Sequence, residues 1–456
     1  MKVIIGLEQH LQLNTRAKLF CECPTEKYLE AESNSLVCPT CTSQPGSKPY
    51  GINEEALAKV LKIALALNCK VNVGKPIFMQ RKHYFYPDLP SNYQRTSKPI
   101  AEKGELAGVR IREVHLEEDP GRYDLKSGTV DYNRCGIPLI EIVTEPDITS
   151  PENAREFLDE LQAIMNYLDV AREEPGSTRV DANISFEGHN RVEVKNINSF
   201  KGVLTALTYE ITRQKNLLKH RQEIIQETRH FDEAQGTTIG LRKKETVADY
   251  RYFPDPDVPP MVISDAFVEM VRNELPELPR QKMQRFMKQY KLAKEEAFVL
   301  TLERDFADAF ETVARQAKPK DAAQFMRGVL RKQLNYRSMK LADSGITLED
   351  LVELLGMLEK KRITVKAAEK LLILMLDEKK KLRELPVFEE FVGIEKEHVV
   401  EHAVMEAIQE NPKAIEDYKK GGEKAFHFIF GKVMKKTRGK ADPANVRALL
   451  KKYLNV

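Results

Sequence analysis

No apolar run in the sequence approaches the roughly 18 residues that a membrane-spanning helix needs. The chain opens with a strand-like segment, Met1 to Ile5, and no signal-peptide apolar region follows it. Cysteine is scarce: six residues among 456 are too few for the disulfide scaffold of a secreted protein. These absences predict a cytoplasmic protein with no membrane association.

The sequence also lacks the common phosphate-binding loops. Neither the Walker A pattern G-x-x-x-x-G-K-[ST] nor the dinucleotide fingerprint G-x-G-x-x-G occurs. If the protein binds a nucleotide, metal ions and side chains must therefore hold its phosphates.

An excess of charge of either sign is missing as well. There are 72 basic and 69 acidic side chains, 31% of residues are charged and 42% are apolar. This composition is typical of a globular protein rather than a disordered or fibrous one. A length of 456 residues predicts two or three domains.

Residues 1–292 mix short alternating strands, turns and a few amphipathic helices, which predicts an α+β domain. We expect helices over Glu54 to Leu67 and Val203 to Leu218. A third begins at Ser150 and Pro151, a good helix start, and an apolar stripe from Phe157 to Leu168 follows.

An alternating pattern between Ser177 and Ile197 predicts a β-hairpin with a turn over Glu187 to Asn190. One face of the hairpin is apolar. The other carries the polar side chains Arg179, Asp181, Asn183, Ser185, Arg191, Glu193 and Lys195. A half-solvated antiparallel sheet gives the same pattern without any function.

After about Leu292, Lys, Glu, Leu and Ala recur at helical spacing to the end of the sequence. We predict an all-α domain over residues 293–385 and a small all-α tail over 386–456. The tail ends in a run of basic residues that includes Lys435, Lys436 and Arg438. Such a run is either a solvated helix face or a contact to a phosphate backbone.

Four of the cysteines form two close pairs, Cys21 with Cys23 and Cys38 with Cys41. Four thiolates close a tetrahedral zinc shell with no open position, so the pattern predicts a structural Zn²⁺ site. Reduced thiols without a metal are the alternative.

Carboxylates gather in three short strand-like segments around Glu8, Glu118 and Glu141, and His10 shares a strand face with Glu8. If these strands are neighbours, their side chains can converge on a Mg²⁺ ion. The alternative is that each glutamate pairs with a basic residue on its own sheet. A loop around Tyr84 interleaves basic and aromatic residues, as nucleotide and RNA sites do.

Together these segments resemble the B-subunit family of the glutamyl-tRNA(Gln) and aspartyl-tRNA(Asn) amidotransferases, over nearly the whole chain. The matching segments are Gly6-Leu7-Glu8 with His10, the two cysteine pairs, Tyr84-Phe85-Tyr86-Pro87-Asp88, His115-Leu116-Glu117-Glu118-Asp119, Asp131-Tyr132-Asn133-Arg134, Pro138-Leu139-Ile140-Glu141-Ile142-Val143, Asp181-Ala182-Asn183, Lys195-Asn196, Asn198-Ser199-Phe200 and Asp249-Tyr250-Arg251-Tyr252-Phe253-Pro254.

The resemblance implies a glutamine-synthetase-like cradle domain with a mostly antiparallel sheet, a helical domain and a tRNA-binding tail. It implies a ligase that uses ATP and Mg²⁺ to phosphorylate the glutamate or aspartate on Glu-tRNA(Gln) or Asp-tRNA(Asn). Ammonia from an A-type amidase subunit then gives the amide, in a heterotrimer with a small C-type subunit.

The family pattern makes His10, Glu118 and Glu141 the expected Mg²⁺ ligands and catalytic residues, with Glu8 beside them. The residues expected to contact substrate or ATP are Tyr84, Arg179, Asp181, Asn183 and Lys195. Lys435, Lys436 and Arg438 are the expected tRNA contacts.

Two departures from the family pattern bear on the structure. Gln9 stands where the family usually has an apolar residue, so either it finds a hydrogen-bond partner on the apolar face or the strand edge there is open to water. The chain has Glu174-Pro175-Gly176-Ser177 where the family commonly has Glu-Glu-Gly-Ser. Two other functions remain open: an archaeal E-type subunit, which carries an additional domain, and a non-catalytic, zinc-stabilised tRNA-binding protein.

Overall fold

A computed structural model describes residues 1–172, 174, 176–243, 250–388, 397–419, 423–437, 441 and 443–454. The chain divides into two compact units, Met1–Arg280 and Gln281–Val456. The first unit combines strands with helices, and the described residues of the second form helices alone.

The first unit is built on a large, mostly antiparallel sheet. Its main path has the order β14-β13-β12-β11-β1-β10-β7-β5-β4-β15, with β6 beside β7 and β2 beside β6. These strands are β1 (Val3–Gln12), β2 (Lys70–Val71), β4 (Met79–His83), β5 (Tyr93–Ser97), β6 (Ala101–Leu106), β7 (Val109–Glu118), β10 (Pro138–Thr144), β11 (Thr178–Phe186), β12 (Val192–Ile197), β13 (Glu227–Asp232), β14 (Thr237–Lys243) and β15 (Phe253–Pro254). Two small ribbons pair β3 (Pro76–Ile77) with β16 (Met261–Val262) and β8 (Arg122–Tyr123) with β9 (Val130–Asp131).

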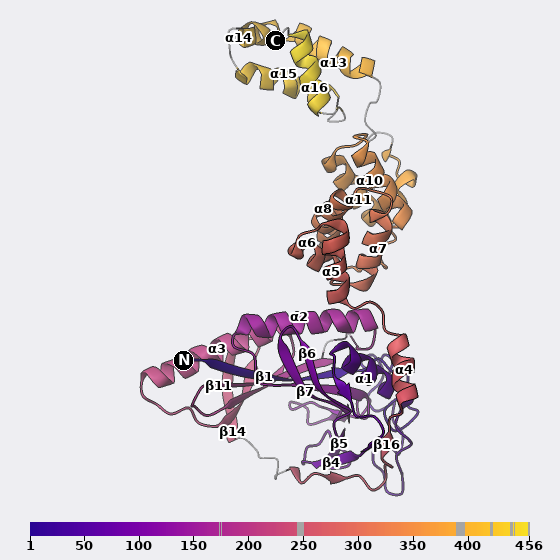
Figure 1. Cartoon of the computed structure of the whole chain (residues 1–456), viewed down its shortest axis with the longest axis vertical. Helices are drawn as coiled ribbons and strands as arrows, with labels where there is room; N and C mark the ends of the chain where they lie inside the picture. Colours follow the sequence, from indigo (N-terminus) through magenta and orange to yellow (C-terminus); the bar gives the residue numbers. More distant parts are fainter. Residues whose placement is uncertain are drawn as a thin grey trace. The chain divides into compact units, whose positions relative to one another are not determined.

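Helices α1 (Glu54–Ala66), α2 (Pro151–Leu168) and α3 (Phe200–Lys219) pack on one face of this sheet, as Figure 1 shows. A short α4 (Asp265–Asn273) packs beside α1. All three predicted helices are confirmed. The Ser150 side chain accepts a hydrogen bond from the backbone N–H of Asn153 and caps α2, as its sequence predicts.

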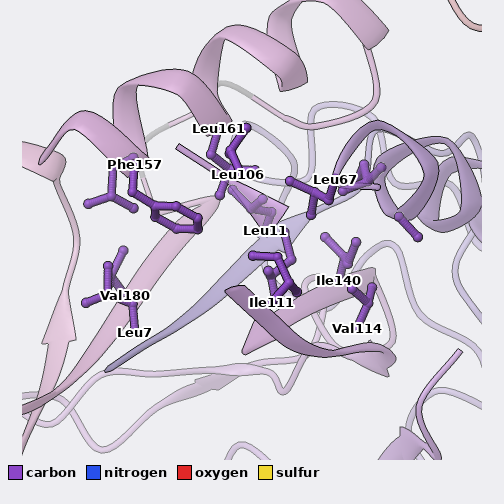
Figure 2. Close-up of a cluster of buried hydrophobic side chains, with 14 of the residues drawn as sticks. Leu7, Leu11, Leu67, Leu106, Ile111, Val114, Ile140, Phe157, Leu161 and Val180 are labelled. Atoms are coloured by element: carbon purple, nitrogen blue, oxygen red, sulfur yellow. The ribbon is translucent and has the colours of Figure 1, made fainter. Parts of the chain in front are cut away.

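The core of this unit lies between the sheet and these helices (Figure 2). Leu7, Leu11 and Val180 extend from the sheet toward Phe157 and Leu161 of α2, and each is at most 2% exposed. Burying one such side chain contributes about 1.5 to 3 kcal/mol. Because side chains alternate along a strand, this apolar face forces the intervening polar residues onto the opposite face.

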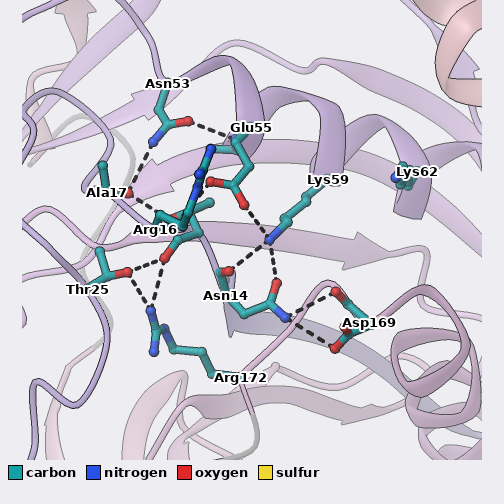
Figure 3. Close-up of polar contacts among 12 residues, drawn as sticks. Asn14, Arg16, Ala17, Thr25, Asn53, Glu55, Lys59, Lys62, Asp169 and Arg172 are labelled. Carbon is teal, nitrogen blue, oxygen red and sulfur yellow. Dashed lines mark hydrogen bonds and ion pairs between the residues drawn. The ribbon is translucent and has the colours of Figure 1, made fainter.

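A polar network anchors the segment between β1 and the loop that carries the paired cysteines, Cys21 to Cys41, here called the cysteine loop (Figure 3). The Lys59 ammonium donates to the backbone oxygen of Asn14 at 2.8 Å and to its side-chain oxygen at 2.7 Å. The Asn14 amide in turn donates to Asp169. Arg172 donates to the Thr25 hydroxyl at 2.6 Å. These contacts hold the start of the cysteine loop against α1 and the end of α2.

In the described part of the second unit, the regular elements are all helical. Its elements are α5 (Pro279–Tyr290), α6 (Lys294–Leu300), α7 (Arg304–Ala314), α8 (Pro319–Phe325), the π-helical turn η2 (Met326–Leu330), α9 (Arg331–Tyr336), α10 (Leu348–Glu359), α11 (Val365–Glu378), the 3₁₀ turn η3 (Leu382–Glu384), α13 (Glu397–Glu410), α14 (Pro412–Lys419), α15 (Glu423–Lys436) and α16 (Pro443–Tyr453).

The division between the units falls before most of α5, earlier than the boundary expected at residue 292. The physical reason is that α5 packs on α7: the rings of Phe286 and Phe310 lie 5.1 Å apart and Arg285 pairs with Glu311 at 2.7 Å. Residues Val400 to Leu454 share a hydrophobic cluster of their own. The boundary expected near residue 385 stays a prediction.

Candidate functional site

The polar face of the sheet in the first unit holds the candidate site. In β1, Leu7 and Leu11 point into the core, so Glu8 and His10 lie on the opposite face. β1 lies between β10 and β11, which places His10 opposite Glu141 on one side and Arg179 on the other. Residues far apart in the sequence therefore meet on one surface.

Three side chains on this face form a compact cluster: His10, Glu117 and Glu141. The His10 Nε2 atom lies 3.6 Å from a Glu117 oxygen and 3.5 Å from a Glu141 oxygen. One ligand atom of each residue lies within 4.8 Å of the other two. Two carboxylates and an imidazole at this spacing suit a divalent cation such as Mg²⁺, which takes mainly oxygen ligands together with substrate phosphates.

Glu118, the glutamate that the sequence pattern placed in this cluster, lies elsewhere. Its carboxylate accepts hydrogen bonds from the Arg95 backbone N–H at 3.2 Å and from the Arg95 guanidinium at 3.4 Å. The cause is strand alternation in β7: Glu117 shares a face with His115, which is opposite Glu141, and Glu118 does not. Glu117, which was not among the expected ligands, takes this position in the cluster, and the parity of His115 could have indicated it. The role expected for Glu118 stays a prediction.

Burial and the neighbouring charges shift the pKa values of all three groups in the cluster. Burial alone would lower the pKa of His10, but its hydrogen bond with Glu141 and the nearby carboxylates raise that pKa overall. Burial raises the pKa of Glu117, and the charge of Glu141 raises it further. Burial opposes ionisation of Glu141 too, yet its pKa is lowered because His10 bonds to it. Carboxylates held this close favour a bound cation.

Glu8 lies on the same face, next to the hairpin formed by β11 and β12. The Asn183 amide donates to its carboxylate at 3.0 Å. Burial and the charges of Glu141 and Asp181 raise the pKa of Glu8. Glu8 and Asn183 therefore adjoin the cluster without belonging to its three closely spaced ligand atoms.

The β11–β12 hairpin has the two faces that its sequence predicts. Ala182 pairs with Val194 on the buried face, and both are fully buried. On the polar face the Lys195 ammonium donates to Asp181 at 2.8 Å. Burial opposes the charge on Lys195, but Asp181 and Glu193 raise its pKa overall, so Lys195 is cationic at neutral pH.

Arg179, at the start of the hairpin, contacts the buried Asp119. Its guanidinium donates to the Asp119 carboxylate at 2.5 Å. Asp119 also accepts a hydrogen bond from Gln12 at 2.6 Å. The charge of Asp119 is the first cause that raises the pKa of Arg179, so the guanidinium stays charged, and its hydrogen bond to Asp119 holds it on the polar face.

Two cavities adjoin on this face. The larger has a volume of about 600 Å³, and Glu8, Glu117, Glu141 and His115 line it. Its remaining lining includes the basic residues Lys98, Arg112 and Arg191. The smaller has a volume of about 380 Å³, and His10, Tyr84, Arg179, Asp181 and Asn196 line it.

Lys82, Lys195 and Tyr250 line both cavities. Burial opposes the charge on Lys82, but the carboxylates of Glu117 and Glu141 raise its pKa overall. Two cations therefore stand where the cavities meet, next to the carboxylate cluster. Lys82 was not among the site residues expected from the sequence.

The predicted aromatic loop borders the smaller cavity. The Tyr84 hydroxyl donates to Gln94 at 3.1 Å, and its ring meets that of Tyr250 edge-on at 6.3 Å. Phe85 and Tyr86 extend outward, with 69% and 50% of their surfaces exposed. The Arg251 guanidinium lies 6.0 Å from the Phe85 ring.

The four paired cysteines meet as predicted. The sulfur atoms of Cys21, Cys23, Cys38 and Cys41 all lie within 4.8 Å of one another. This spacing matches a tetrahedral Zn²⁺ shell, in which sulfurs at about 2.3 Å from the metal are just under 4 Å apart. The donor set therefore fits a structural zinc.

A buried lysine borders this cysteine cluster. The Lys18 ammonium donates to Cys41 Sγ at 3.5 Å, to the Leu36 oxygen at 2.9 Å and to the Tyr132 oxygen at 3.3 Å. Only 1% of Lys18 is exposed. The hydrogen bond from Cys21 and the charge of Lys18 lower the pKa of Cys41 to about 5.

Gln9 is on the apolar face, as strand parity predicts, and it is 1% exposed. Among the described residues neither atom of its side-chain amide has a hydrogen-bond partner. The expected partner on that face is therefore missing from the part of the chain that the structure covers. Pro175, the other departure, lies outside the described residues.

In the helical unit, the predicted tRNA contacts differ from one another. Lys435 is exposed, whereas the Lys436 ammonium pairs with Glu410 at 2.7 Å and with Glu406 at 3.1 Å. Arg438 lies outside the described residues. In the described part of the chain, no helix is both long and apolar enough to cross a membrane.

Comparison with known proteins adds independent findings. Residues 3–269 match the model of the GatB/GatE catalytic domain, and residues 308–454 match that of the GatB domain. The chain is 53% identical over 452 residues to the B subunit of the aspartyl/glutamyl-tRNA(Asn/Gln) amidotransferase of Methanobrevibacter smithii, covering 99% of this chain and 100% of that protein. It is 54% identical over 449 residues to the protein of the same name in Methanothermobacter thermautotrophicus, covering 98% and 99%.

Proposed function

Because the chain belongs to the family of aspartyl/glutamyl-tRNA(Asn/Gln) amidotransferase B subunits, we propose that it activates the glutamate or aspartate of a misacylated tRNA for amidation. It acts as the ligase component of a multi-subunit enzyme whose substrate is tRNA. The first unit is the catalytic cradle, with a glutamine-synthetase-like arrangement of its antiparallel sheet.

The reaction has two steps. A side-chain carboxylate oxygen of the charged amino acid attacks the γ-phosphorus of ATP, the bond from that phosphorus to the bridging oxygen breaks, and ADP leaves. Ammonia then attacks the acyl carbon, inorganic phosphate leaves with the electron pair, and the surplus proton of ammonia is released. Activation is needed because phosphate is a far better leaving group than oxide.

The observation that carries this proposal is the position of the His10, Glu117 and Glu141 cluster beside two adjoining cavities. These three residues would hold Mg²⁺, which when bound offsets the repulsion between ATP and the incoming carboxylate. Glu8 stands next to them to complete the polar shell.

The two cavities suit the two substrates. The larger one offers Lys98, Arg112 and Arg191 to a polyanion, so it takes the triphosphate of ATP. The smaller one, with Tyr84 and Arg179, takes the aminoacyl end of the tRNA. The γ-phosphate and the carboxylate then meet at the boundary between the two cavities.

Lys82 and Lys195 line that boundary, where negative charge gathers as the phosphoryl group moves. Asp181 holds the Lys195 ammonium at 2.8 Å, which fixes the direction of that charge before substrates bind. Asp181 therefore acts through Lys195, and Asn183 acts through Glu8.

The cysteine cluster holds a structural Zn²⁺ in this proposal and takes no part in the chemistry. Ammonia comes from a separate A-type amidase subunit, with a small C-type subunit completing a heterotrimer in the cytoplasm. The tail contributes to tRNA binding through Lys435, Lys436 and Arg438.

The direct test is an amidation assay in which ammonium chloride replaces the amidase subunit. The full chain, ATP, Mg²⁺ and Glu-tRNA(Gln) or Asp-tRNA(Asn) should give Gln-tRNA(Gln) or Asn-tRNA(Asn), and omission of ATP should abolish the product. Absence of product with both charged tRNAs, in a preparation that binds them, would leave the idle tRNA-binding protein as the better account.

A further inference from the structure

One side of the helix formed by η2 and α9 carries an unusual set of exposed residues. Gly328, Lys332, Asn335 and Tyr336 are all exposed, and their spacing of four, seven and eight positions places them on one side of the helix. We call these four residues the α9 face. None of them takes part in the site described above.

Tyr336 is the most exposed aromatic side chain among the large hydrophobic residues of the described chain, at 85%. Its neighbour Leu334 is buried, so the helix has a core-facing side and Tyr336 is not on it. The Arg337 guanidinium lies 5.8 Å from the Tyr336 ring. Aromatic side chains concentrate at binding surfaces, because they supply a large contact area at a small cost in side-chain entropy.

In the described part of the chain, no other group approaches Gly328 closely enough to need its missing side chain. Glycine inside a helix costs about 1 kcal/mol relative to alanine. A Cβ atom at Gly328 would meet nothing within 4 Å, so no neighbouring group requires the smaller residue. What glycine does provide is an approachable helix backbone. The π-helical turn around it, Met326–Leu330, is of a kind often found at functional sites.

Basic side chains are frequent along this helix, and acidic residues elsewhere in the unit pair with three of them, the first being Arg327, which lies 3.7 Å from Glu296. Residues 326–340 include Arg327, Arg331, Lys332, Arg337 and Lys340 and no aspartate or glutamate. Arg331 pairs with Glu303 at 2.8 Å, and Arg337 pairs with Asp377 at 2.5 Å. Lys332 has no such ion pair within the described residues, so its ammonium is available to an outside anion.

We propose that the α9 face is a docking site for RNA, which on the proposed function is the tRNA substrate. Lys332 pairs with a backbone phosphate, Tyr336 stacks on an unpaired base, and Gly328 lets the sugar–phosphate chain approach the helix. An accessible backbone beside a free cation and an exposed aromatic ring suits a polyanion with planar bases better than an apolar protein surface.

The sharpest test is Gly328→Ala in the assembled amidotransferase. Because alanine favours the helix and meets no neighbour, the variant should melt at the same temperature as the wild type or higher. Its tRNA affinity should nevertheless fall about fivefold or more. The matched control is Gly356→Ala in α10, where a Cβ also meets nothing within 4 Å, and there the affinity should not change.

Two further variants address the chemistry of the contact. Tyr336→Ala should weaken tRNA binding about tenfold, in line with the loss of one base stack. Lys332→Gln should reduce the salt dependence of binding by about one unit in the log–log slope. Lys320→Gln, an exposed lysine of α8, is the control and should leave both quantities unchanged.

The outcomes separate this inference from the proposed function. If the wild-type enzyme binds and amidates the charged tRNA while all three α9-face variants bind it equally well, the α9 face has no role in tRNA binding. Variants that fail to assemble with the amidase subunit, yet keep their tRNA affinity, would show a protein-binding surface and also overturn it. Failure of the wild type to bind any tRNA would instead count against the proposed function.

Discussion

The His10 imidazole lies 3.5 Å from the Glu141 carboxylate, although the two residues belong to strands that are far apart in the sequence. The pairing of β1 with β10 places them directly opposite each other. Glu117, from β7, completes the cluster from the other side of β10. Sheet order, rather than any local motif, therefore builds the candidate metal site.

The first prediction distinguishes two adjacent glutamates. Glu117→Gln should weaken Mn²⁺ binding at least about tenfold, because it removes a ligand from the cluster. Glu118→Gln should leave Mn²⁺ binding nearly unchanged, since Glu118 bonds to Arg95. Titration of the full chain with Mn²⁺, followed by electron paramagnetic resonance, measures both. Equal losses would place Glu118 among the ligands after all.

Features that depend on neighbouring residues could be predicted from the sequence. Strand alternation and capping patterns correctly predicted the β11–β12 faces and the start of α2, because both depend on neighbouring residues. Cysteine spacing likewise predicted the four-sulfur cluster. Such patterns predict structure correctly because residues close together in the sequence determine them.

Long-range order was not predictable in the same way. The position of β1 between β10 and β11 depends on the packing of the whole sheet. The sequence could therefore predict that His10 and Glu141 converge only if their strands are neighbours. The start of the helical unit at α5 depends on ring contacts between Phe286 and Phe310, which no single segment reveals. Gln9 shows the opposite case: parity gave its face, but not its lack of a hydrogen-bond partner among the described residues.

The second prediction concerns the cysteine cluster. Purified protein should contain one zinc per chain, and Cys38→Ser should lower its melting temperature by at least about 5 °C, because a structural metal contributes directly to folding stability. Elemental analysis and thermal unfolding are the measurements. Full stability in a preparation that contains no zinc would contradict it.

The third prediction concerns the buried cation beside that cluster. Lys18→Met should speed zinc release to a chromogenic chelator several-fold, since the ammonium stabilises thiolate charge at Cys41. Lys59→Met is the control: its ammonium bonds to Asn14 and does not touch the sulfur atoms. Identical release from wild type and Lys18→Met would show that this charge is unimportant.

The fourth prediction is a pH dependence of stability that comes from Glu210. Burial opposes ionisation of this residue, but hydrogen bonds from Arg213 and Gln214 lower its pKa overall below the ordinary value of 4.5. Its stabilising effect is therefore full above pH 4.5 and is lost as the pH falls through the lowered pKa.

Denaturant unfolding between about pH 3 and pH 7 tests this effect. Glu210→Gln should destabilise the protein by about 2 kcal/mol at pH 7 and by clearly less at the acid end, because the wild-type charge is then gone as well. Glu269→Gln removes an exposed carboxylate and should show no such difference. A loss for Glu210→Gln that stays constant with pH would contradict the linkage.

The fifth prediction contrasts two neighbouring lysines of α15. Lys435→Ala should lower the salt dependence of tRNA binding by about one unit of slope, because its ammonium is exposed. Lys436→Ala should change it less, because Glu406 and Glu410 already neutralise that charge. Binding isotherms at several salt concentrations give both slopes, and the reverse order would show that the tail presents another surface to RNA.

The central claim is that the cluster of His10, Glu117 and Glu141 supports ATP-dependent activation of the charged amino acid. The most direct measurement is ATP hydrolysis by the enzyme assembled with its amidase subunit, with and without Glu-tRNA(Gln) or Asp-tRNA(Asn), for wild type and Glu141→Gln. The account predicts stimulation by charged tRNA in the wild type and a loss of at least about 100-fold in the variant. Stimulation that survives in Glu141→Gln would contradict the assigned site, and no stimulation by either charged tRNA would contradict the activity itself.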